Sequence, residues 1–339
     1  MKWLNFMVAA FLGFSMIGTA HAGPVLDAIH KRDAVRCGVS SGVAGFSALG
    51  ADGLWRGLDV SVCRAVAAAV LGNAQKVEFT PLSSQQRFAA LQAGQIDILS
   101  RNTTWTLSRD AGLNVHFTAI TYFDGQGILM PTHFGVKSAK ELNGAEICVQ
   151  SGTTNEKNLS TYLGMQGIKA KAIVYDNFEA AYKAFFSGRC QAFSTDVSAL
   201  IGLKSSQSGK PDAYTVLPEV FSKEPLGPAV LRGDDEFFAI VKWVVFAMIE
   251  AEELGVGQAN IEQALHSKNP AVQRFLGGAE NLGKPLGLPQ DWVVKIIQQV
   301  GNYGEVFDAN LGKQSPLKLE RGLNALWTQG GLMYAPPLR

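Results

Sequence analysis

The chain has 339 residues, with 30 lysines and arginines against 29 aspartates and glutamates, so its formal net charge is +1. This balance, without basic tracts, argues against a nucleic-acid partner. The 36 glycines suit an α/β protein with many tight connections. The length is sufficient for two lobes with separate hydrophobic cores.

The first 22 residues have the features of a cleaved signal peptide. A positive start, Met1-Lys2, precedes an apolar run from Leu4 to Ile17, and the segment ends in Ala20-His21-Ala22, an A-x-A cleavage pattern. The run is too short to cross a membrane comfortably, which disfavours a retained anchor. We therefore expect residues 1–22 to be removed and a soluble mature chain, beginning at Gly23, to be exported.

The four cysteines are an even number in a chain that is predicted to be exported, which favours disulfides over metal ligands. Three pairings are possible. We prefer Cys37–Cys63 and Cys148–Cys190, because each closes a loop within one half of the chain, whereas a bridge between the halves would restrict their relative motion. Buried free thiols are the alternative. In the chain-entropy model each bridge would stabilise its half by about 3–4 kcal/mol.

Strand and helix patterns alternate after the predicted cleavage site. In the first half we expect strands at 35–39, 76–80 and 96–99, and helices at 58–71 and 83–93, the second opened by a capping box at Ser83 and Gln86. In the second half we expect strands at 145–149, 171–175 and 190–193, and helices at 154–163 and 177–186. Each half places a strand before a Ser-Gly loop and later joins a helix to a strand through a glycine. Chance similarity is the alternative to the weak internal repeat that predicts two similar α/β lobes.

Two extended segments, residues 125–131 and 225–231, are suited to crossing between the lobes. Beyond Arg232, helices are expected at 234–253, 260–266, 291–300 and 317–327. We therefore expect a discontinuous first lobe of residues 23–127 and 229–339, which includes a C-terminal helical extension. The second lobe would consist of residues 128–228, and two hinge crossings would join the lobes.

Ligands of open α/β sheets bind beyond the carboxyl ends of the strands. After the strand at 96–99, a hydroxyl-rich loop leads to Arg109, whose guanidinium suits a carboxylate, and Thr104 would donate a further hydrogen bond. After the strand at 145–149, the run Ser151-Gly152-Thr153-Thr154 opens a helix whose free N–H groups favour an anion.

The loop after the strand at 190–193 carries Asp196, whose carboxylate suits an ammonium group. Two anion sites facing one cation site fit a zwitterion, of which an α-amino acid is the commonest small example. Each feature also has an ordinary explanation. Arg109 could lie on the surface, the Ser-Gly-Thr-Thr run could be a helix N-cap, and Asp196 could only cap the next helix. Their combination in repeated α/β halves favours the binding hypothesis.

A hydrolase is the competing hypothesis, because Gly38-Val39-Ser40-Ser41-Gly42 matches the G-x-S-x-G nucleophile elbow. That motif needs a helix directly after the serine, whereas residues 43–53 have the composition of a loop. The histidines are scattered without metal-ligand spacing or triad order. These observations disfavour the hydrolase.

The chain resembles the periplasmic amino-acid-binding proteins of ABC importers, solute-binding protein family 3, and within it the general L-amino-acid-binding subgroup. The resemblance covers essentially the whole mature chain. The segments that carry it are Gly57-Leu58-Asp59-Val60, residues 99–106, Tyr122-Phe123-Asp124-Gly125-Gln126-Gly127, Gly152-Thr153-Thr154, residues 300–305 and residues 330–337.

The resemblance implies a type II periplasmic-binding-protein fold, a periplasmic location, a free L-amino acid as ligand and an inner-membrane ABC permease as partner. It also implies a monomer with no cofactor, no metal and no enzymatic activity. In the implied roles, Arg109 clamps the α-carboxylate with help from Thr104 and Thr154, and Asp196 pairs with the α-ammonium near the Asn102 backbone. Phe46 lines the pocket, either Tyr122 or Asp124 flanks it at the hinge, and Gly152 is a further ligand-binding residue.

Two departures bear on specificity. Relatives that prefer cationic amino acids carry an aspartate where this chain has Ser40, and an aromatic residue where it has Val43. We therefore expect weak selectivity for cationic side chains and a broad preference that includes neutral or polar amino acids. A dehydratase-like periplasmic enzyme on the same fold, with Asp124 as its acid or base, and an amino-acid-sensing adaptor are the alternatives.

Overall fold

A computed structural model describes residues 23–206, 211–278 and 280–339. The predicted signal peptide, residues 1–22, lies outside the described residues. None of the helices in these ranges has both the length and the apolar character needed to span a membrane.

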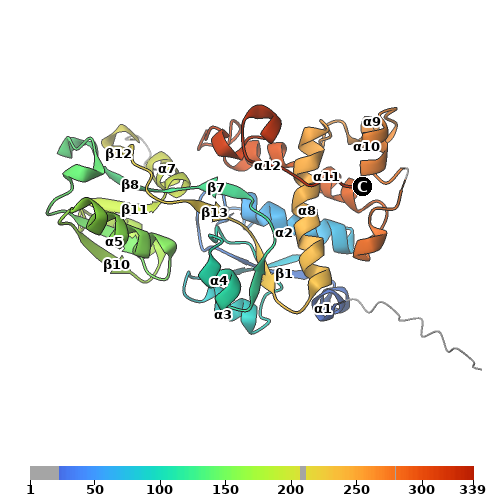
Figure 1. Ribbon diagram of the computed structural model, residues 1–339, viewed down its shortest axis with the longest axis horizontal. Coiled ribbons are helices and arrows are strands. Elements are labelled where there is room, and N and C mark those ends of the chain that lie inside the picture. Colours follow the sequence, from blue (N-terminus) through green and yellow to red (C-terminus); the bar gives the residue numbers. More distant parts are fainter. Residues whose placement is uncertain (1–22, 207–210, 279) are drawn as a thin grey trace, which may run out of the picture.

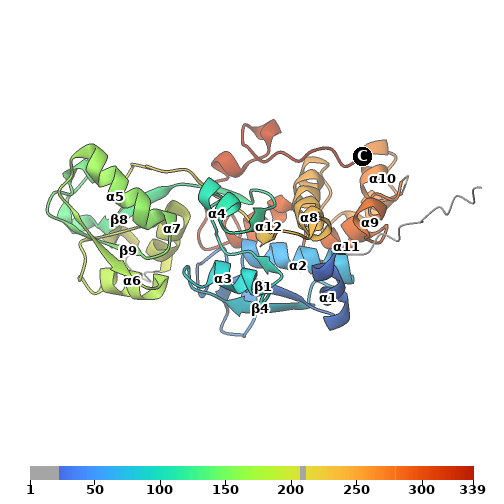
Figure 2. The same cartoon turned by 60° about the horizontal axis from the view of Figure 1, so that its bottom comes forward.

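Two five-stranded sheets organise the described part of the chain, each in its own lobe (Figures 1 and 2). The first sheet has the order β4-β1-β5-β14-β6, with β4 at Val77–Pro81, β1 at Val35–Val39, β5 at Ile98–Leu99, β14 at Ala229–Leu231 and β6 at Val115–Phe117. The second has the order β10-β9-β11-β8-β12, with β10 at Lys171–Tyr175, β9 at Glu146–Gln150, β11 at Ala192–Asp196, β8 at Gln126–Pro131 and β12 at Tyr214–Val216. A small ribbon pairs β2 (Ala48–Leu49) with β3 (Trp55–Arg56). The α/β architecture in two lobes agrees with the fold that the sequence predicts.

In each sheet the strands that precede the predicted binding loops run parallel. β1 pairs in parallel with β4 and β5, and β9 pairs in parallel with β10 and β11. Parallel neighbours bring their carboxyl ends to the same edge, so the loops after β1, β4 and β5 gather on one lobe and those after β9 and β11 on the other.

The lobes are joined by two short antiparallel strands, β7 (Tyr122–Asp124) and β13 (Glu224–Leu226), which lie side by side between the sheets (Figure 1). The first crossing was expected at residues 125–131, but β8 occupies most of that segment and is an internal strand of the second sheet. The second crossing segment, 225–231, is shared between β13 and β14 of the first sheet. We therefore propose that the crossings are β7 and β13, a few residues before the expected positions.

Helices cover both sheets. In the first lobe they are α1 (Pro24–Arg32), α2 (Leu58–Leu71), α3 (Arg87–Gln92) and α4 (Leu107–Gly112), and in the second they are α5 (Thr154–Gln166), α6 (Phe178–Phe186) and α7 (Val197–Ser206). Helix α2 is apolar almost all round, which suits its position packed against β1, α8 and α11. Asn177 caps α6 by accepting from the Ala180 N–H at 2.8 Å.

The C-terminal extension consists mainly of helices packed on the first lobe (Figure 1). They are α8 (Asp235–Glu253), α9 (Ile261–Leu265), α10 (Pro270–Phe275), α11 (Trp292–Gln299) and α12 (Tyr303–Asn310). Short 3-10 turns occur here at Lys284–Leu286, Gly322–Asn324 and Trp327–Gln329, and elsewhere at Thr132–Phe134, Ala139–Glu141 and Pro211–Ala213.

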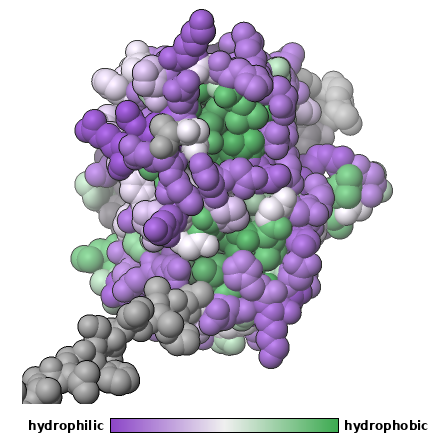
Figure 3. Space-filling model, turned by 90° about the vertical axis from the view of Figure 1, so that its right-hand side faces the viewer, coloured by the Kyte–Doolittle hydropathy of each residue, from purple (hydrophilic) through white to green (hydrophobic). Residues whose placement is uncertain are grey.

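The helix predicted at residues 317–327 is wrong. Lys318 and Gly322 have φ values of 48° and 49°, in the left-handed region, which interrupts a right-handed helix at both positions. The right-hand side of the molecule in Figure 1, which includes α9 and α10, exposes apolar side chains in separate areas framed by hydrophilic ones (Figure 3). An apolar pocket in the extension is lined by Trp243, Leu282, Pro285, Leu286, Trp292, Pro337, Leu338 and Arg339.

The preferred disulfide pairing is confirmed. Cys37 of β1 bonds Cys63 of α2, and Cys148 of β9 bonds Cys190 just before β11, with sequence separations of 26 and 42. Each bridge fastens a helix or loop to the central sheet of a single lobe. Neither bridge therefore restricts movement between the lobes.

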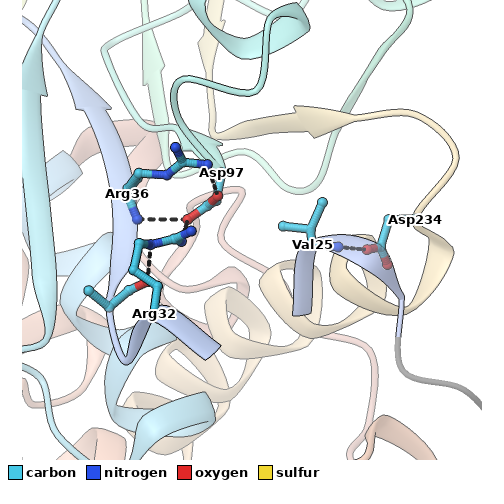
Figure 4. A network of polar contacts seen from close by, with 6 residues as sticks. Val25, Arg32, Arg36, Asp97 and Asp234 are labelled. Carbon is cyan, nitrogen blue, oxygen red and sulfur yellow. Dashed lines mark hydrogen bonds and ion pairs between the residues drawn. The ribbon is translucent and has the colours of Figure 1, made fainter. Parts of the chain in front are cut away.

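Helix α1 is tied to the first lobe at both ends (Figure 4). At its start, the Val25 N–H donates to Asp234 Oδ2 at 2.8 Å. At its end, Arg32 pairs with the buried carboxylate of Asp97 at the entrance to β5, and Arg36 of β1 pairs with the same carboxylate. The mature N-terminus is thereby held against the start of α8.

Candidate ligand-binding site

A polar cleft lies between the two lobes at the carboxyl ends of their strands. We call it the Asp196 cleft; it is lined by Val43, Ser84, Arg87, Arg101, Asn102, Thr104, Gln150, Thr153, Thr154, Asn155, Phe178, Thr195, Asp196 and Ala199. The lining comes from loops after β1, β4 and β5 on one side and from loops and helices after β9 and β11 on the other. This position is the one that the strand-end rule predicts.

The first lobe supplies the positive charge of the Asp196 cleft. Arg87, which is 3% exposed, donates to Thr103 Oγ1 and to the carbonyl oxygen of Gly152, both at 3.3 Å. Arg101 donates from Nε to the carbonyl oxygen of Leu82 at 2.9 Å. Burial lowers the pKa of both guanidinium groups, that of Arg101 to about 10. An anion in the cleft would offset the cost of burying these two cations.

The second lobe supplies a buried carboxylate at the end of β11. Asp196 is 5% exposed and accepts a hydrogen bond from Asn155 Nδ2 at 2.9 Å. Burial raises the pKa of Asp196 well above its usual value, and the negative charges of Asp124 and Glu224 raise it further. A cation beside Asp196 would stabilise the ionised form of this carboxyl group, because it would offset both effects.

Several polar atoms of the Asp196 cleft have no hydrogen-bond partner among the described residues. They are the hydroxyl oxygen of Ser84, Nε of Arg87 and Oδ1 of Asn102. Buried polar atoms are rarely left without partners, so these atoms are available to a ligand. They comprise a donor on a cation, a hydroxyl and a neutral acceptor, which match an anionic group and an ammonium group.

Hydrogen bonds to Asp59 hold the loop around Asn102 in its conformation. The φ of Asn102 is 31°, in the left-handed region, and its N–H donates to Asp59 Oδ2 at 2.7 Å. Ser100 donates to the same carboxylate at 3.3 Å. Asp59 is buried, which raises its pKa to about 7. The aspartate thus positions the loop that carries the unpartnered oxygen of Asn102.

Arg109 does not line the Asp196 cleft. It lines an adjoining groove, the Arg109 groove, which is lined by Ser84, Gln85, Phe88, Thr106, Ser108, Arg109, Leu113, Gly152, Thr153, Thr154, Glu156, Lys157 and Asn158. Its Nη1 donates to the carbonyl oxygen of Thr104 at 2.8 Å, and its guanidinium lies 5.6 Å from the centre of the Phe88 ring. Ser84, Thr153 and Thr154 line both spaces, so the groove and the cleft are adjacent.

Thr104 and Thr154 lie close together across the boundary between the lobes, with their hydroxyl oxygens 3.3 Å apart. Gly152 is beside them, in the Arg109 groove, and its carbonyl oxygen accepts from Arg87. The structure therefore brings these three predicted residues together with Asp196 and Asn102.

The remaining predicted residues lie in the hinge region, with Phe46 and Tyr122 buried and Asp124 half-buried, and they line neither space among the described residues. The Phe46 ring packs edge-on against Tyr122 with their centres 5.2 Å apart, and Tyr122 stacks on Phe307. Asp124 accepts from the N–H of Gly125 at 2.8 Å and from the hydroxyl of Ser198. Burial raises its pKa to about 6. These three residues therefore lie in the hinge and do not form part of a pocket wall.

The sequence of this chain matches the profile of the bacterial extracellular solute-binding proteins, family 3, over residues 35–258. The chain belongs to this family. It is 46% identical to the general L-amino acid-binding periplasmic protein AapJ of Rhizobium johnstonii, over 99% of both chains. It is also 46% identical to the glutamate/glutamine/aspartate/asparagine-binding protein BztA of Rhodobacter capsulatus, over the whole of both chains.

A solved structure agrees with this family assignment. The periplasmic binding protein of Brucella ovis with glutathione bound is 46% identical, with a TM-score of 0.91, over 94% of this chain and 100% of that one. The type II periplasmic-binding-protein fold of the family is therefore the fold of this chain as well.

Sequence reasoning did not single out Ser84, Arg87, Arg101 or Glu224 as site residues. Ser84 and Arg87 follow β4, and the same strand-end rule that led to the other loops would have indicated them. Glu224 gives no comparable signal, because it lies between Lys223 and Pro225, just before the crossing predicted at residues 225–231 and outside every predicted strand and helix.

Proposed function

We propose that the chain is the periplasmic component of an ABC importer that captures free amino acids by closing its two lobes. The observation that carries this proposal is the Asp196 cleft, where buried cations of one lobe face a buried carboxylate of the other. Several polar atoms of this cleft have no hydrogen-bond partner among the described residues. A ligand that bears both charges gains contacts in the closed state that are absent in the open state, which drives closure.

The ligand would be oriented by its two charged groups. The ammonium pairs with Asp196 and with the Asn102 loop. The α-carboxylate lies within reach of Arg109 and of the backbone of Thr154, as the family resemblance implies, whereas the hydroxyls of Thr104 and Thr154 donate to Glu224. Charge-assisted hydrogen bonds contribute about 1.5–3 kcal/mol each, so a few of them, offset by closure costs, give micromolar to nanomolar affinity.

The side chain of the ligand would then lie toward Arg87, Arg101 and Ser84. These donors favour a side-chain carboxylate or amide, and the name of the relative BztA, which refers to glutamate, glutamine, aspartate and asparagine, supports this choice. The hydroxyl of Ser40 is hydrogen-bonded to that of Ser47, with their oxygens 2.6 Å apart. Because serine is neutral, Ser40 supplies no charge for a cationic side chain. We propose a broad spectrum in which acidic amino acids and their amides bind best.

Calorimetric titration with the twenty amino acids tests this proposal. We expect glutamate, aspartate, glutamine and asparagine to bind most tightly, neutral amino acids more weakly, and lysine and arginine weakest. Lysine binding more tightly than glutamate would contradict the proposed side-chain orientation. Absence of binding by any amino acid would contradict the function itself.

The Arg109 groove favours a second candidate, a short peptide. Because the groove is adjacent to the Asp196 cleft and offers Lys157, Glu156 and the Phe88 ring, it has space and charges for a ligand longer than an amino acid. The relative from Brucella ovis holds glutathione, a tripeptide. Competition between glutathione and glutamate in the same titration distinguishes one shared site from amino-acid binding alone.

The proposed partner is an inner-membrane ABC permease, which would bind the closed monomer. We also propose that the chain is not an enzyme. The dehydratase-like alternative would need Asp124 to face the ligand, whereas its carboxylate is engaged by Ser198 and Gly125. Incubation with amino acids and hydroxylated ring acids, followed by analysis for products, tests this absence of turnover.

A further inference from the structure

Glu224 of the hinge strand β13 is a buried carboxylate at the boundary between the lobes. It is 1% exposed. Its Oε2 accepts from Thr104 Oγ1 at 2.6 Å and from Thr154 Oγ1 at 2.8 Å. The two threonines belong to different lobes, because Thr104 follows β5 of the first sheet and Thr154 begins α5, which packs on the second.

The second oxygen of Glu224 is held in the same manner. Oε1 accepts from Asn158 Nδ2 and from Ser222 Oγ, both at 2.7 Å. Glu224 forms no ion pair within the described ranges, although Arg109 is close enough to feel its charge. Neutral hydrogen-bond donors therefore satisfy this buried negative charge, and those donors come from both lobes.

The donors of Glu224 differ in how they are attached. Thr104 is fixed to β13 itself, through a backbone bridge with Leu226 and a hydrogen bond from the Trp105 N–H to the Pro225 carbonyl oxygen at 2.8 Å. Thr154 and Asn158 lie on the first turns of α5 and belong to the second lobe. Rotation about the hinge would therefore withdraw α5 from Glu224 and leave Thr104 in place.

We propose that Glu224 is an interlobe latch. Its carboxylate binds Thr154 and Asn158 only when the lobes are closed, and it sets the closing equilibrium without touching the ligand. The proposal rests on lobe closure in the proposed function and adds a residue that controls it. Glu224 is thus a positioning residue, which acts on the ligand through α5.

A latch of this kind has a distinctive effect on affinity. The apparent dissociation constant equals the intrinsic constant divided by the fraction of protein that is competent to hold the ligand. A weakened latch lowers the closed fraction by one factor that does not depend on the ligand. Every amino acid should then lose affinity equally, and the loss should appear as faster release.

The test is Glu224→Gln, which keeps the shape of the side chain but replaces one acceptor oxygen with a donor. Glu219→Gln is the matched control, because Glu219 accepts from the Ala139 N–H at 3.0 Å and from the Ser138 hydroxyl, within the second lobe alone. Stopped-flow fluorescence would give the release rates of glutamate, glutamine and alanine. We expect release from Glu224→Gln to be about tenfold faster for all three, with association unchanged, and release from Glu219→Gln to match that of the wild type.

Different factors for glutamate and for the neutral amino acids would overturn the latch, because they would show that Glu224 contacts the ligand. Unchanged release rates, or equal acceleration by Glu219→Gln, would also overturn it. Small-angle scattering of ligand-free protein tests the latch separately from the ligand, since the variant should have a larger mean radius of gyration than the wild type. An unchanged radius would count against the latch even if the wild-type protein bound no amino acid.

Discussion

The guanidinium of Arg87, a residue that lines the Asp196 cleft, reaches from the first lobe to the carbonyl oxygen of Gly152 in the second, at 3.3 Å, and its Nε atom has no hydrogen-bond partner among the described residues. Arg109 lies in the adjoining groove and donates to its own loop at Thr104. The two arginines therefore line different spaces, and their replacement should affect different parts of the proposed ligand.

Replacing Arg109 with alanine should abolish measurable binding of every amino acid, because all of them share the α-carboxylate. Arg87→Gln should weaken glutamate and aspartate by about 2–5 kcal/mol and alanine by much less, because it removes a partner of the side-chain carboxylate only. Calorimetry with glutamate and alanine measures both effects, and thermal melting shows whether each variant is folded. Equal losses for glutamate and alanine in Arg87→Gln would assign Arg87 to the α-carboxylate instead.

Asp196 should release a proton when it binds the ligand. Its pKa is raised in the free protein, and an ammonium group beside it would lower that pKa, so affinity should increase as the pH rises toward the free-state value. Titration calorimetry in buffers of different ionisation enthalpy counts the protons released. Asp196→Asn should release none through this group and bind about 2–5 kcal/mol more weakly. A variant that lost thermal stability but kept its affinity would indicate that Asp196 only caps α7.

Asp59 should make the ligand-free protein less stable as the pH rises from about 4 to 7. Its pKa is about 7 in the folded chain and 3.8 ordinarily, so across this window the folded state binds a proton that the unfolded state does not. The free energy of unfolding then decreases by up to about 1.4 kcal/mol per pH unit. Urea unfolding of the wild type and Asp59→Asn at several pH values isolates the effect, since other buried carboxylates contribute to both. Parallel pH profiles would show that Asp59 does not titrate there.

Much of the fold could be predicted because its signals are local. Helix α2 was predicted with its observed bounds, since its apolar residues end at a glycine that adopts the left-handed conformation. The parallel strands and both disulfides followed from short apolar runs and from the halves that they define. The hinge was harder, because β7 and β13 are three residues each and carry no periodic pattern.

In the candidate site, too, only features with a local sequence signal could be predicted. Loops after predicted strands could be proposed as ligand-binding, and the structure brings Thr104, Thr154 and Asp196 together. Glu224 could not be found in this way, because its partners Thr104 and Thr154 are 120 and 70 residues away in the sequence. When the hydrogen-bond donors of a buried charged residue are distant in the sequence, the residues next to it carry no pattern that would reveal the contact.

The last prediction concerns the mature N-terminus. The Gly23 nitrogen donates to Glu236 Oε2 at 2.9 Å, and a Cβ at this position would lie 2.0 Å from Asp234 Oδ1. Cleavage after Ala22 would turn that amide into an ammonium group between two carboxylates. We therefore expect N-terminal sequencing of the exported protein to begin at Gly23, and Gly23→Ala to destabilise it by displacing Asp234.

The charge of that ammonium group should stabilise the mature protein by about 0.5–1 kcal/mol relative to protein acetylated at Gly23. An α-amino group ordinarily has a pKa near 8, and the two carboxylates would raise it, so the stabilisation is fully present below about pH 7 and is lost as the pH rises through the higher folded value. Urea unfolding at pH 6 and pH 10 measures the difference, which Glu236→Gln should largely remove. Equal stability of the free and acetylated proteins at pH 6 would mean that the ammonium group points into solvent, away from Glu236.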